Sequence, residues 1–501
     1  MAGSLNGVDP RTPVLIGAGQ VHHRDGDAPE PVDLLAEAAR RAVDDCGAPR
    51  VLQAIASVRV VNMLSRRYPD PGALVAERLG VPVGHTVLTT EGGQMPQALV
   101  DRAARDIVSG LAGVVLVGGA ESWRTRNAYR RRGERPPWSV QPDGTGPSET
   151  FGEPLRMTSP GESALGLTDP VQAYPMFEQA LRSHTGRSLA GQVATASDLW
   201  SRFSRVAVSN PYAAVPRYCS PEEIRTPGPA NRMIGFPYPK LMNSNSSVDQ
   251  GAALLLCAAG TARDLGVPRD RWVFLHGAAE GEDTTYLSER QDLGGSPAIT
   301  LAGATALELA GIGVGEVAHV DLYSCFPSAV QVAAAALGLP LERRLTVTGG
   351  LTFAGGPWNN YVSHSIATML GLLREDPDAF GLCTANGGLL TKHAVAVYSC
   401  RPVTGPVDPA ARVRSVREDL AATVTTRTAA PRYDGTARVE TWTVMHDRDG
   451  RPERAYVFAA PDDARRTLAT TDEPELLDVL TTTDILGRVA TVQSGALKEV
   501  R

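Results

Sequence analysis

Two glycine pairs, each placed after a strand-like run, constrain the fold of this chain most strongly. Gly92-Gly93 follows Thr89-Thr90-Glu91, and Gly349-Gly350 follows Thr346-Val347-Thr348. A helix-like and then a strand-like segment come next, at 97–110 and 113–122 after the first pair and at 361–375 and 380–388 after the second. The repeated order predicts an internally duplicated α/β architecture, in which both glycine corners matter for function.

Strand-like and helix-like segments alternate over most of the chain. Strands are predicted at 14–17, 57–63 and 86–89, with helices at 31–46 and 72–79 between them. The alternation continues with a helix at 248–265, a strand at 272–276, a helix at 301–309, a strand at 317–323 and a helix at 328–337. Repeated strand and helix units predict a mainly parallel sheet with both faces covered.

Two regions break this alternation. Residues 124–242 begin rich in proline, glycine and arginine and then carry helix-like stretches near 174–182 and 192–208, as expected of an inserted loop domain. After a linker at 401–411, strands at 439–445 and 454–459 flank Asp447-Arg448-Asp449-Gly450 as a hairpin. The expected domains are an N-terminal half (1–123 with 243–270), the loop domain (124–242), a C-terminal half (271–404) and a small β-rich module (405–501).

Composition argues against several classes of protein. A hydrophobic content of 43% with 21% charged residues is typical of soluble globular proteins, and a net charge of −6 argues against a nucleic-acid binder. Residues 1–13 contain no apolar leader and no stretch is long enough to span a bilayer, so a cytoplasmic protein is expected. The six cysteines form no CxxC pair, which predicts reduced thiols without a disulfide framework or a cysteine metal site.

The first glycine corner and the strand that follows its helix resemble the thiolase superfamily. Gly118-Gly119-Ala120-Glu121-Ser122 is similar to the Gly-Gly-Met-Glu-Ser motif of thiolases. Counting back from it along the helix places the thiolase nucleophile, a cysteine, at Gly93. By this resemblance the usual nucleophile is absent.

Three further loops carry the resemblance. Gly355-Gly356-Pro357 resembles the Gly-His-Pro loop, with Gly356 at the histidine, and Ala385-Asn386-Gly387-Gly388 resembles the loop of the second cysteine, with Ala385 at that cysteine. Tyr323-Ser324-Cys325-Phe326 is similar to the His-Asp-Cys-Phe loop of sterol-carrier-protein type thiolases, so that Cys325 is the surviving thiol.

The resemblance extends over about residues 10–404 and includes Met242 to Ala253, which is similar to the Asp-Gly-Ala-Ala segment of thiolases. With the tail included, the chain most closely resembles the thiolase-like proteins of type 1, often named acetyl-CoA acetyltransferases. This implies a duplicated thiolase fold of five αβαβα layers and an additional C-terminal domain similar to an OB-fold. Either a monomer or a homodimer is compatible with that family.

The resemblance implies an acyl-CoA-binding acyltransferase that uses coenzyme A or acyl-CoA as substrate, without a tightly bound cofactor or metal. Because the usual nucleophile is absent, two alternatives remain open: a retro-aldol or retro-Claisen lyase acting on an acyl-CoA, and a non-catalytic acyl-CoA or lipid binding protein. The candidate oxyanion-binding positions are Gly93, Gly356, Asn386 and Gly387.

Four side chains are candidate catalytic groups: the thiol of Cys325, the phenol of Tyr323, and the imidazoles of His364 and His393. His364 follows the second corner at the start of a helix, whose dipole lowers an imidazole pKa, and His393 opens the final strand beside Asn386. Structural roles are the alternative for each: an inert buried thiol, a packing tyrosine, a histidine within a helix interface and a strand-edge residue.

Candidate CoA-binding residues are Asn243, Asn245 and Ser246, together with Arg124 and Arg126, whose guanidinium groups suit phosphates. A solvated loop face is the alternative for the arginines. Other chemistries find little support, because the sequence contains no HExxH or Walker motif and its Gly161-Glu162-Ser163-Ala164-Leu165 segment departs from GxSxG at the last position.

Overall fold

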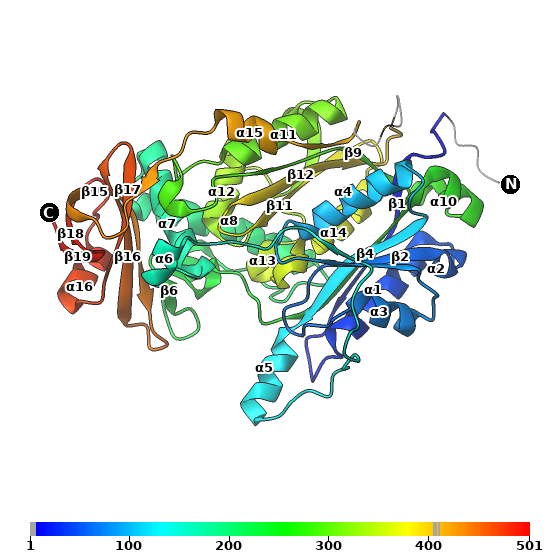
Figure 1. The fold of residues 1–501 in the computed structure, drawn as a ribbon, viewed down its shortest axis with the longest axis horizontal. Coiled ribbons are helices and arrows are strands. Elements are labelled where there is room, and N and C mark those ends of the chain that lie inside the picture. Colours follow the sequence, from blue (N-terminus) through cyan, green and yellow to red (C-terminus); the bar gives the residue numbers. More distant parts are fainter. Residues whose placement is uncertain (1–6, 404–407, 409–410) are drawn as a thin grey trace.

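The computed structural model describes residues 7–403, 408 and 411–501. Parts of the polar N-terminal segment (1–6) and of the predicted linker (404–407 and 409–410) therefore lie outside the described residues. Figure 1 shows an elongated molecule, with a large α/β body at the end of the N-terminus and a small β-rich module at the end of the C-terminus. Within the described ranges, no helix combines the length and the apolar content needed to cross a bilayer.

One mixed sheet of eleven strands forms the body. The strands run in the order β10-β11-β12-β9-β1-β8-β4-β2-β3-β5, and β13 pairs with β9. Their bounds are β1 (Pro13–His22), β2 (Ile55–Val60), β3 (His85–Thr89), β4 (Val114–Ser122), β5 (Glu149–Phe151), β8 (Asp249–Ala258), β9 (Val273–Glu282), β10 (Val317–Asp321), β11 (Phe380–Gly387), β12 (Lys392–Ser399) and β13 (Val413–Ser415).

The two halves of this sheet repeat one pairing pattern. In β2-β4-β8-β1 the successive pairs are parallel, antiparallel and antiparallel, and β10-β11-β12-β9 shows the same series. The halves join where Val14 and Leu15 of β1 pair with Phe274 and Val273 of β9. The duplication predicted from the glycine corners is therefore confirmed.

Helices cover the sheet in layers. In the N-terminal half α1 packs on β1, β4 and β8, in the C-terminal half α11 packs on β9 and β12, and α4 and α14 contact each other between the halves. Gly19 lets α1 approach closely, because a Cβ there would overlap Ala38 O. The helices are α1 (Pro31–Cys46), α2 (Arg50–Gln53), α3 (Pro71–Leu79), α4 (Met95–Val108), α10 (Ala259–Leu265), α11 (Pro297–Ala310), α12 (Pro327–Ala336), α13 (Gly350–Phe353) and α14 (Tyr361–Glu375).

Two predictions about the sheet are wrong. The segment 248–265, predicted as one helix, forms strand β8 followed by the short helix α10. Its alanines and leucines favour a helix, but the segment is buried between β1 and β4, and pairing on both sides overrides that preference. The sheet is also mixed rather than mainly parallel, since only four residues connect β11 to β12 and so short a link requires an antiparallel pair.

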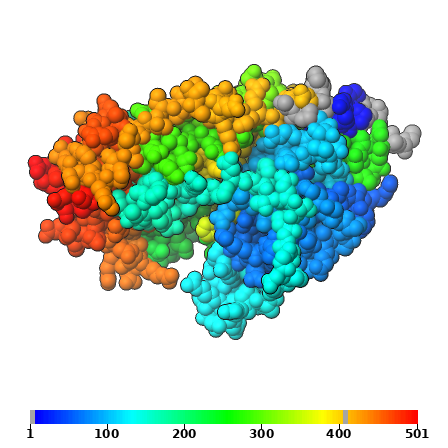
Figure 2. Space-filling view, in the orientation of Figure 1, coloured from blue at the N-terminus to red at the C-terminus, as the bar shows by residue number. Residues whose placement is uncertain are grey.

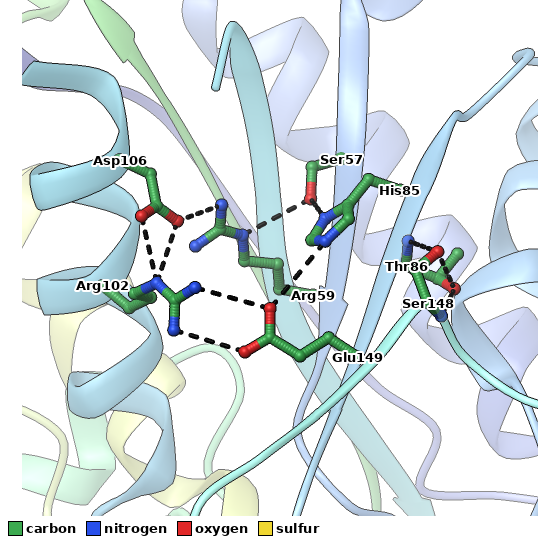
Figure 3. A network of polar contacts seen from close by, with 8 residues as sticks. All are labelled: Ser57, Arg59, His85, Thr86, Arg102, Asp106, Ser148 and Glu149. Carbon is green, nitrogen blue, oxygen red and sulfur yellow. Dashed lines mark hydrogen bonds and ion pairs between the residues drawn. The ribbon is translucent and has the colours of Figure 1, made fainter. Parts of the chain in front are cut away.

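Strand β5 covers the edge of the sheet at β3. The two strands pair in parallel, with Leu88 opposite Thr150. Figure 3 shows the polar network that holds them: Arg102 contacts Glu149 of β5 at 3.3 Å and Asp106 at 3.0 Å, and buried Arg59 pairs with Asp106 at 2.7 Å. An edge that would offer free backbone groups for pairing is thereby blocked.

The inserted region supplies helices α5 (Trp123–Arg132), α6 (Pro160–Ala164), α7 (Pro170–Thr185), α8 (Leu189–Ser209) and α9 (Pro221–Arg225), and strands β6 (Met233–Gly235) and β7 (Tyr238–Pro239). The long helices α7 and α8 contain the two predicted helical stretches. Helix α7 packs against α12 on one side and against the C-terminal module on the other. In Figure 2, α5 (cyan) projects from the body, and the surface is hollowed between it and the orange C-terminal module.

The C-terminal module is a small closed barrel. Its strands pair in the ring β15-β16-β17-β19-β18-β15, in which only β17 and β19 are parallel, and α16 connects β17 to β18. This is the topology of an OB-fold, as the resemblance implied, and the predicted hairpin is the β15-β16 pair. The barrel elements are β15 (Asp434–His446), β16 (Pro452–Asp462), β17 (Arg465–Thr471), α16 (Pro474–Thr482), β18 (Val489–Gln493) and β19 (Ala496–Val500). Before them, α15 (Arg417–Thr423) packs on β9 and α11 of the body, and β14 (Thr428–Ala429) pairs with β17.

Candidate functional site

A cavity of about 340 Å³ lies beside the first glycine corner. Eight of the predicted site residues line it: Gly93, Asn243, Ser246, Tyr323, Cys325, Gly356, Asn386 and Gly387. The structure thus brings together the first glycine corner, the Gly356 loop, the Cys325 loop and the Asn386 loop, which come from different halves of the duplicated body, whereas the second corner, Gly349-Gly350, is not part of the lining.

Tyr323 occupies the space beside Gly93. A Cβ built on Gly93 would lie 2.5 Å from Tyr323 Oη and still closer to Asn386 O, so position 93 has no room for a side chain. The backbone N–H of Tyr323 donates to Thr384 Oγ1 (2.8 Å), and its ring meets that of Tyr361 edge-on with centroids 5.5 Å apart. The phenol therefore stands where a side chain at position 93 would begin.

The backbone of the first corner presents a hydrogen-bond donor to the cavity. Gly92 N–H donates to Asn359 Oδ1 (3.0 Å), whereas Gly93 N–H has no acceptor among the residues that the structure describes. Gly93 lies just before α4, and the N-terminus of a helix favours negative charge. This arrangement suits the developing negative charge of a polarised carbonyl oxygen.

The Gly356 loop does not supply a free donor. Gly356 N–H donates to Asn245 O (2.9 Å), in contrast to its predicted role as an oxyanion donor. A Cβ on Gly356 would meet Ser244 Cβ at 3.4 Å, a close van der Waals contact, so unlike Gly93 this position has room for a methyl group. Asn245 does not line the cavity itself, and its carbonyl group fixes the loop that does.

Cys325, Tyr174 and Asn386 form a polar cluster on the cavity wall. Asn386 Nδ2 donates to Tyr174 Oη (2.8 Å) and lies 3.8 Å from Cys325 Sγ. Burial raises the pKa of Cys325 to about 12, although hydrogen bonding to Tyr174 opposes the shift. Burial also raises the pKa values of Tyr174 and Tyr323, so at neutral pH the wall presents a thiol and two phenols rather than a thiolate.

Tyr174 was missed at the level of sequence, where it marked only the start of a helical stretch. Helix α7 carries it to the wall, where its ring stacks on Phe326 with centroids 4.3 Å apart. Two carboxylates in the lining, Glu91 and Asp169, were also missed. No motif distinguishes Tyr174 and Asp169, because their position depends on how the inserted region folds back over the body, whereas Glu91 stands in the first glycine corner itself, directly before Gly92.

The two candidate histidines lie outside the cavity lining. His364 is buried with Nδ1 2.8 Å from Gln20 Oε1, and burial lowers its pKa to about 3, which keeps the ring neutral. His393 is only 2% exposed and lies opposite Asn386 across the β11-β12 pair, with Nε2 3.2 Å from Asp283 Oδ2. Neither a strand-edge surface position for His393 nor direct access of His364 to the cavity is observed.

The two candidate arginines differ in their surroundings. Arg124 is paired with buried Asp249 at 2.8 Å and so contributes to the fold. Arg126 lies 4.7 Å above the Trp123 ring, which in turn packs against Trp358 of the cavity lining with centroids 5.9 Å apart. Of the two, only Arg126 is connected to the cavity through side-chain packing.

No group of three or more histidine, cysteine, aspartate or glutamate side chains is arranged to hold a metal ion within the described part of the chain. Asn243 Nδ2 donates to Pro239 O (2.8 Å), whereas Asn243 Oδ1 and the Ser246 hydroxyl have no hydrogen-bond partner within the described residues. The chemistry of the lining therefore comes from backbone N–H, phenol, thiol and carboxylate groups.

Comparison with known proteins identifies both parts of the molecule. Residues 416–496 match the family model of the thiolase-like protein type 1 additional C-terminal domain. The crystal structure of a monomeric SCP2-thiolase like protein type 1 from Mycobacterium smegmatis is 34% identical, with 98% of this chain and 99% of that chain covered and a TM-score of 0.83. Comparison with curated proteins gave no match.

More distant solved structures share the fold of the body. The Ltp2-ChsH2(DUF35) aldolase is 20% identical over 78% of this chain and 98% of that chain, with a TM-score of 0.59. Human mitochondrial 3-ketoacyl-CoA thiolase is 14% identical over 78% of this chain and 99% of that chain, with a TM-score of 0.58. The chain therefore belongs to the SCP2-thiolase-like proteins of type 1, within the thiolase superfamily.

Proposed function

We propose that this protein binds an acyl-CoA thioester in the 340 Å³ cavity and cleaves or forms a carbon–carbon bond of the acyl group without an acyl-enzyme. One observation carries the proposal: the Tyr323 hydroxyl fills the space beside Gly93 where the resemblance to thiolases places the nucleophile. A group that exchanges protons thus replaces a group that would hold the acyl chain.

Binding of the thioester follows from the lining. The carbonyl oxygen accepts a hydrogen bond from Gly93 N–H at the first corner. Apolar side chains that include Leu155, Met157 and Leu351 surround the acyl group and the pantetheine arm. Arg126, above the Trp123 ring that packs against Trp358, is the arginine best placed to meet the phosphates of coenzyme A.

Cleavage in the retro-aldol direction then requires one proton to leave and one to return. The β-hydroxyl proton passes to the Tyr323 oxygen while the phenol transfers its own proton to a neighbouring acceptor, which later returns it. The bond between the α- and β-carbons breaks, and its electron pair forms the enolate of the thioester. Gly93 N–H stabilises the enolate oxygen, and the α-carbon takes a proton back from Tyr323. A β-hydroxyacyl thioester gives a shorter acyl thioester and an aldehyde or ketone, with no net change in protons.

Acyl transfer through Cys325 is less well supported. A thiol with a pKa of about 12 is ionised in only about one molecule in 10⁵ at pH 7, and the thiolate is the nucleophilic form. The hydrogen bonds around Cys325 instead place it with Tyr174 and Asn386 as a polar wall. We expect Cys325→Ala to retain most of the cleavage activity.

Product analysis tests this proposal. The full chain is incubated with β-hydroxyacyl-CoA, acetoacetyl-CoA and acetyl-CoA while free thiol and carbonyl products are measured. We expect a carbonyl product from the β-hydroxyacyl-CoA without thiol release, and a loss of about 10²–10⁴-fold in kcat for Tyr323→Phe with acyl-CoA binding retained. Thiol release that survives Tyr323→Phe would instead indicate acyl transfer, and binding without any turnover would indicate an acyl-CoA binding protein.

A further inference from the structure

A buried carboxylate–histidine pair lies behind Tyr323. His393 Nε2, on β12, is 3.2 Å from Oδ2 of Asp283, which follows directly after β9. Asp283 also accepts hydrogen bonds from Ser296 Oγ and from Ala298 N–H (3.0 Å) at the start of α11. Burial alone would raise the pKa of Asp283, but its contact with His393 and the hydrogen bond from Ser296 lower it, so the carboxylate is held ionised and in a fixed orientation.

A small void separates this pair from the cavity wall. It has a volume of about 10 Å³, and its polar lining comes from Tyr323, Thr384, Asn386 and His393. A single water molecule needs about this much space and two or more polar partners. Asn386 Oδ1 has no hydrogen-bond partner among the described residues and is therefore available to accept a hydrogen bond from such a water molecule.

The remaining charged groups around the pair are engaged elsewhere. Lys392, the neighbour of His393 on β12, pairs with Glu282 at 3.4 Å. Arg290 donates to Leu389 O (2.8 Å) and Thr391 Oγ1 (2.9 Å) and forms no ion pair with Asp283. His393 is therefore the basic side chain that is paired with Asp283.

We propose that Asp283 and His393 form a proton store for Tyr323, connected to the phenol through one water molecule in the void. This rests on the proposed function, in which Tyr323 accepts a substrate proton although its own phenol is protonated at rest. As the β-hydroxyl proton reaches Tyr323, the phenolic proton moves to the water, and a proton of the water moves to His393. After the carbon–carbon bond breaks, the proton returns by the same path to the α-carbon.

In this role His393 is a positioning residue that acts through Tyr323, and Asp283 stabilises the imidazolium while the proton is stored. The pair supplies what the cavity itself lacks, a place for the phenolic proton that is screened from solvent. It also accounts for an otherwise costly arrangement, in which a carboxylate and a histidine are both buried beside an orphaned amide oxygen.

Kinetics of His393→Gln test the proposal, with His276→Gln as the matched control. His276 is likewise buried, on β9, but contacts Arg401 O (2.9 Å) and the Phe380 ring away from the void. For His393→Gln we expect kcat to fall at least about 100-fold, KM and acyl-CoA affinity to stay within about twofold, and the pH dependence of kcat to change. His276→Gln should leave all of these unchanged. An unchanged kcat, or an equal loss of binding and rate, would overturn the proposal.

A second measurement does not depend on turnover. In protein labelled with ¹³C at histidine Cε1, the His393 resonance is the one that disappears in His393→Gln. We expect Tyr323→Phe to shift this resonance, and Tyr398→Phe, which removes a buried hydroxyl bonded to Gln97 elsewhere on β12, to leave it in place. If Tyr323→Phe does not shift the His393 resonance, the connection between Tyr323 and His393 is refuted. If the resonance shifts but the wild type cleaves no substrate, the connection is supported and the proposed reaction is refuted.

Discussion

At the scale of single residues, Gly93 and Tyr323 share one space, so the identity of each limits the other. The glycine is required because the phenol and Asn386 O lie where its Cβ would be. Because Gly93 has no side chain, the Tyr323 phenol can lie directly beside the first glycine corner, whose Gly93 N–H is a hydrogen-bond donor for the cavity. The site is thus specified by a pair of residues that are far apart in sequence.

Gly93→Ala is expected to destabilise the protein by about 3 kcal/mol, because the added methyl group overlaps two neighbours in a packed interior. Combining it with Tyr323→Phe should recover only part of this cost, since Asn386 O remains in place. Denaturant unfolding of both single variants and the double variant measures the coupling. Gly113→Ala, whose Cβ would meet Ala56 Cβ at 3.7 Å, is the control. If the two substitutions change the free energy of unfolding additively, the Gly93 methyl group and the Tyr323 hydroxyl do not compete for the same space.

His364 is expected to make stability depend on pH. Its pKa is lowered by burial from 6.5 to about 3, so the unfolded chain binds the proton first and stability is lost as pH falls from about 6.5 towards 3. In His364→Gln this loss should shrink by on the order of 3 kcal/mol at pH 4 relative to pH 7. Urea unfolding at the two pH values measures it, and an identical pH dependence in the variant would refute the role.

Single residues also mark the limit of what the sequence predicts about the site. Motif spacing located Gly93, Tyr323, Cys325 and Asn386, all of which reach one cavity. It could not locate Tyr174, because no repeating pattern in the inserted region indicates which face of helix α7 packs against the body. Motif position alone also left open which way His364 points.

At the scale of elements, the duplicated order of strands and helices was predictable, but the strand β8, predicted as part of a helix, was not. Periodicity identified α1 and α14 to the residue, because their apolar faces repeat every three or four positions. A segment buried on both faces has no such pattern, so the leucines and alanines of β8 suit either element. Only the pairing with β1 and β4 decides it.

Strand β5 is expected to keep the sheet edge at β3 from pairing with a second copy. Glu149→Arg places a positive charge against Arg102 and should displace β5, whereas Glu149→Gln keeps the shape without the repulsion. Light scattering across protein concentrations should show stronger self-association for Glu149→Arg than for Glu149→Gln or the wild type. Equal association in all three would mean that β5 does not protect this edge.

At the scale of the whole molecule, the barrel supports one wall of the cavity. Two hydrogen bonds join the barrel to helix α7. Thr441 Oγ1 of β15 donates to the carbonyl oxygen of Met176 on α7, and Gln172 Nε2 of α7 donates to Tyr456 Oη of β16 (3.0 Å). Helix α7 also carries Tyr174, so contacts with the module help to position this side chain in the cavity wall. Its sequence predicted a small β-rich unit, but which side of the body it covers depends on contacts that no local pattern encodes.

Arg466 is expected to couple the barrel to the body. It is buried, pairs with Glu440 at 2.6 Å, and donates to Leu287 O (2.9 Å) in the body. Arg466→Met should cost about 3 kcal/mol, because Glu440 loses a buried partner. The exposed neighbour Arg465, paired with Asp462, is the control, and its Met variant should change stability by less than about 0.5 kcal/mol. Calorimetry measures the thermal unfolding of both variants, and an equal change in stability for Arg466→Met and the Arg465 variant would contradict the coupling.

Intact-protein mass spectrometry during turnover of a β-hydroxyacyl-CoA shows whether the acyl group is ever bound covalently. We expect carbonyl product to accumulate while the protein mass stays that of the unmodified chain, because no nucleophile at position 93 or 325 holds the acyl group. An acyl adduct on Cys325 that forms and decays at the rate of turnover would contradict this expectation.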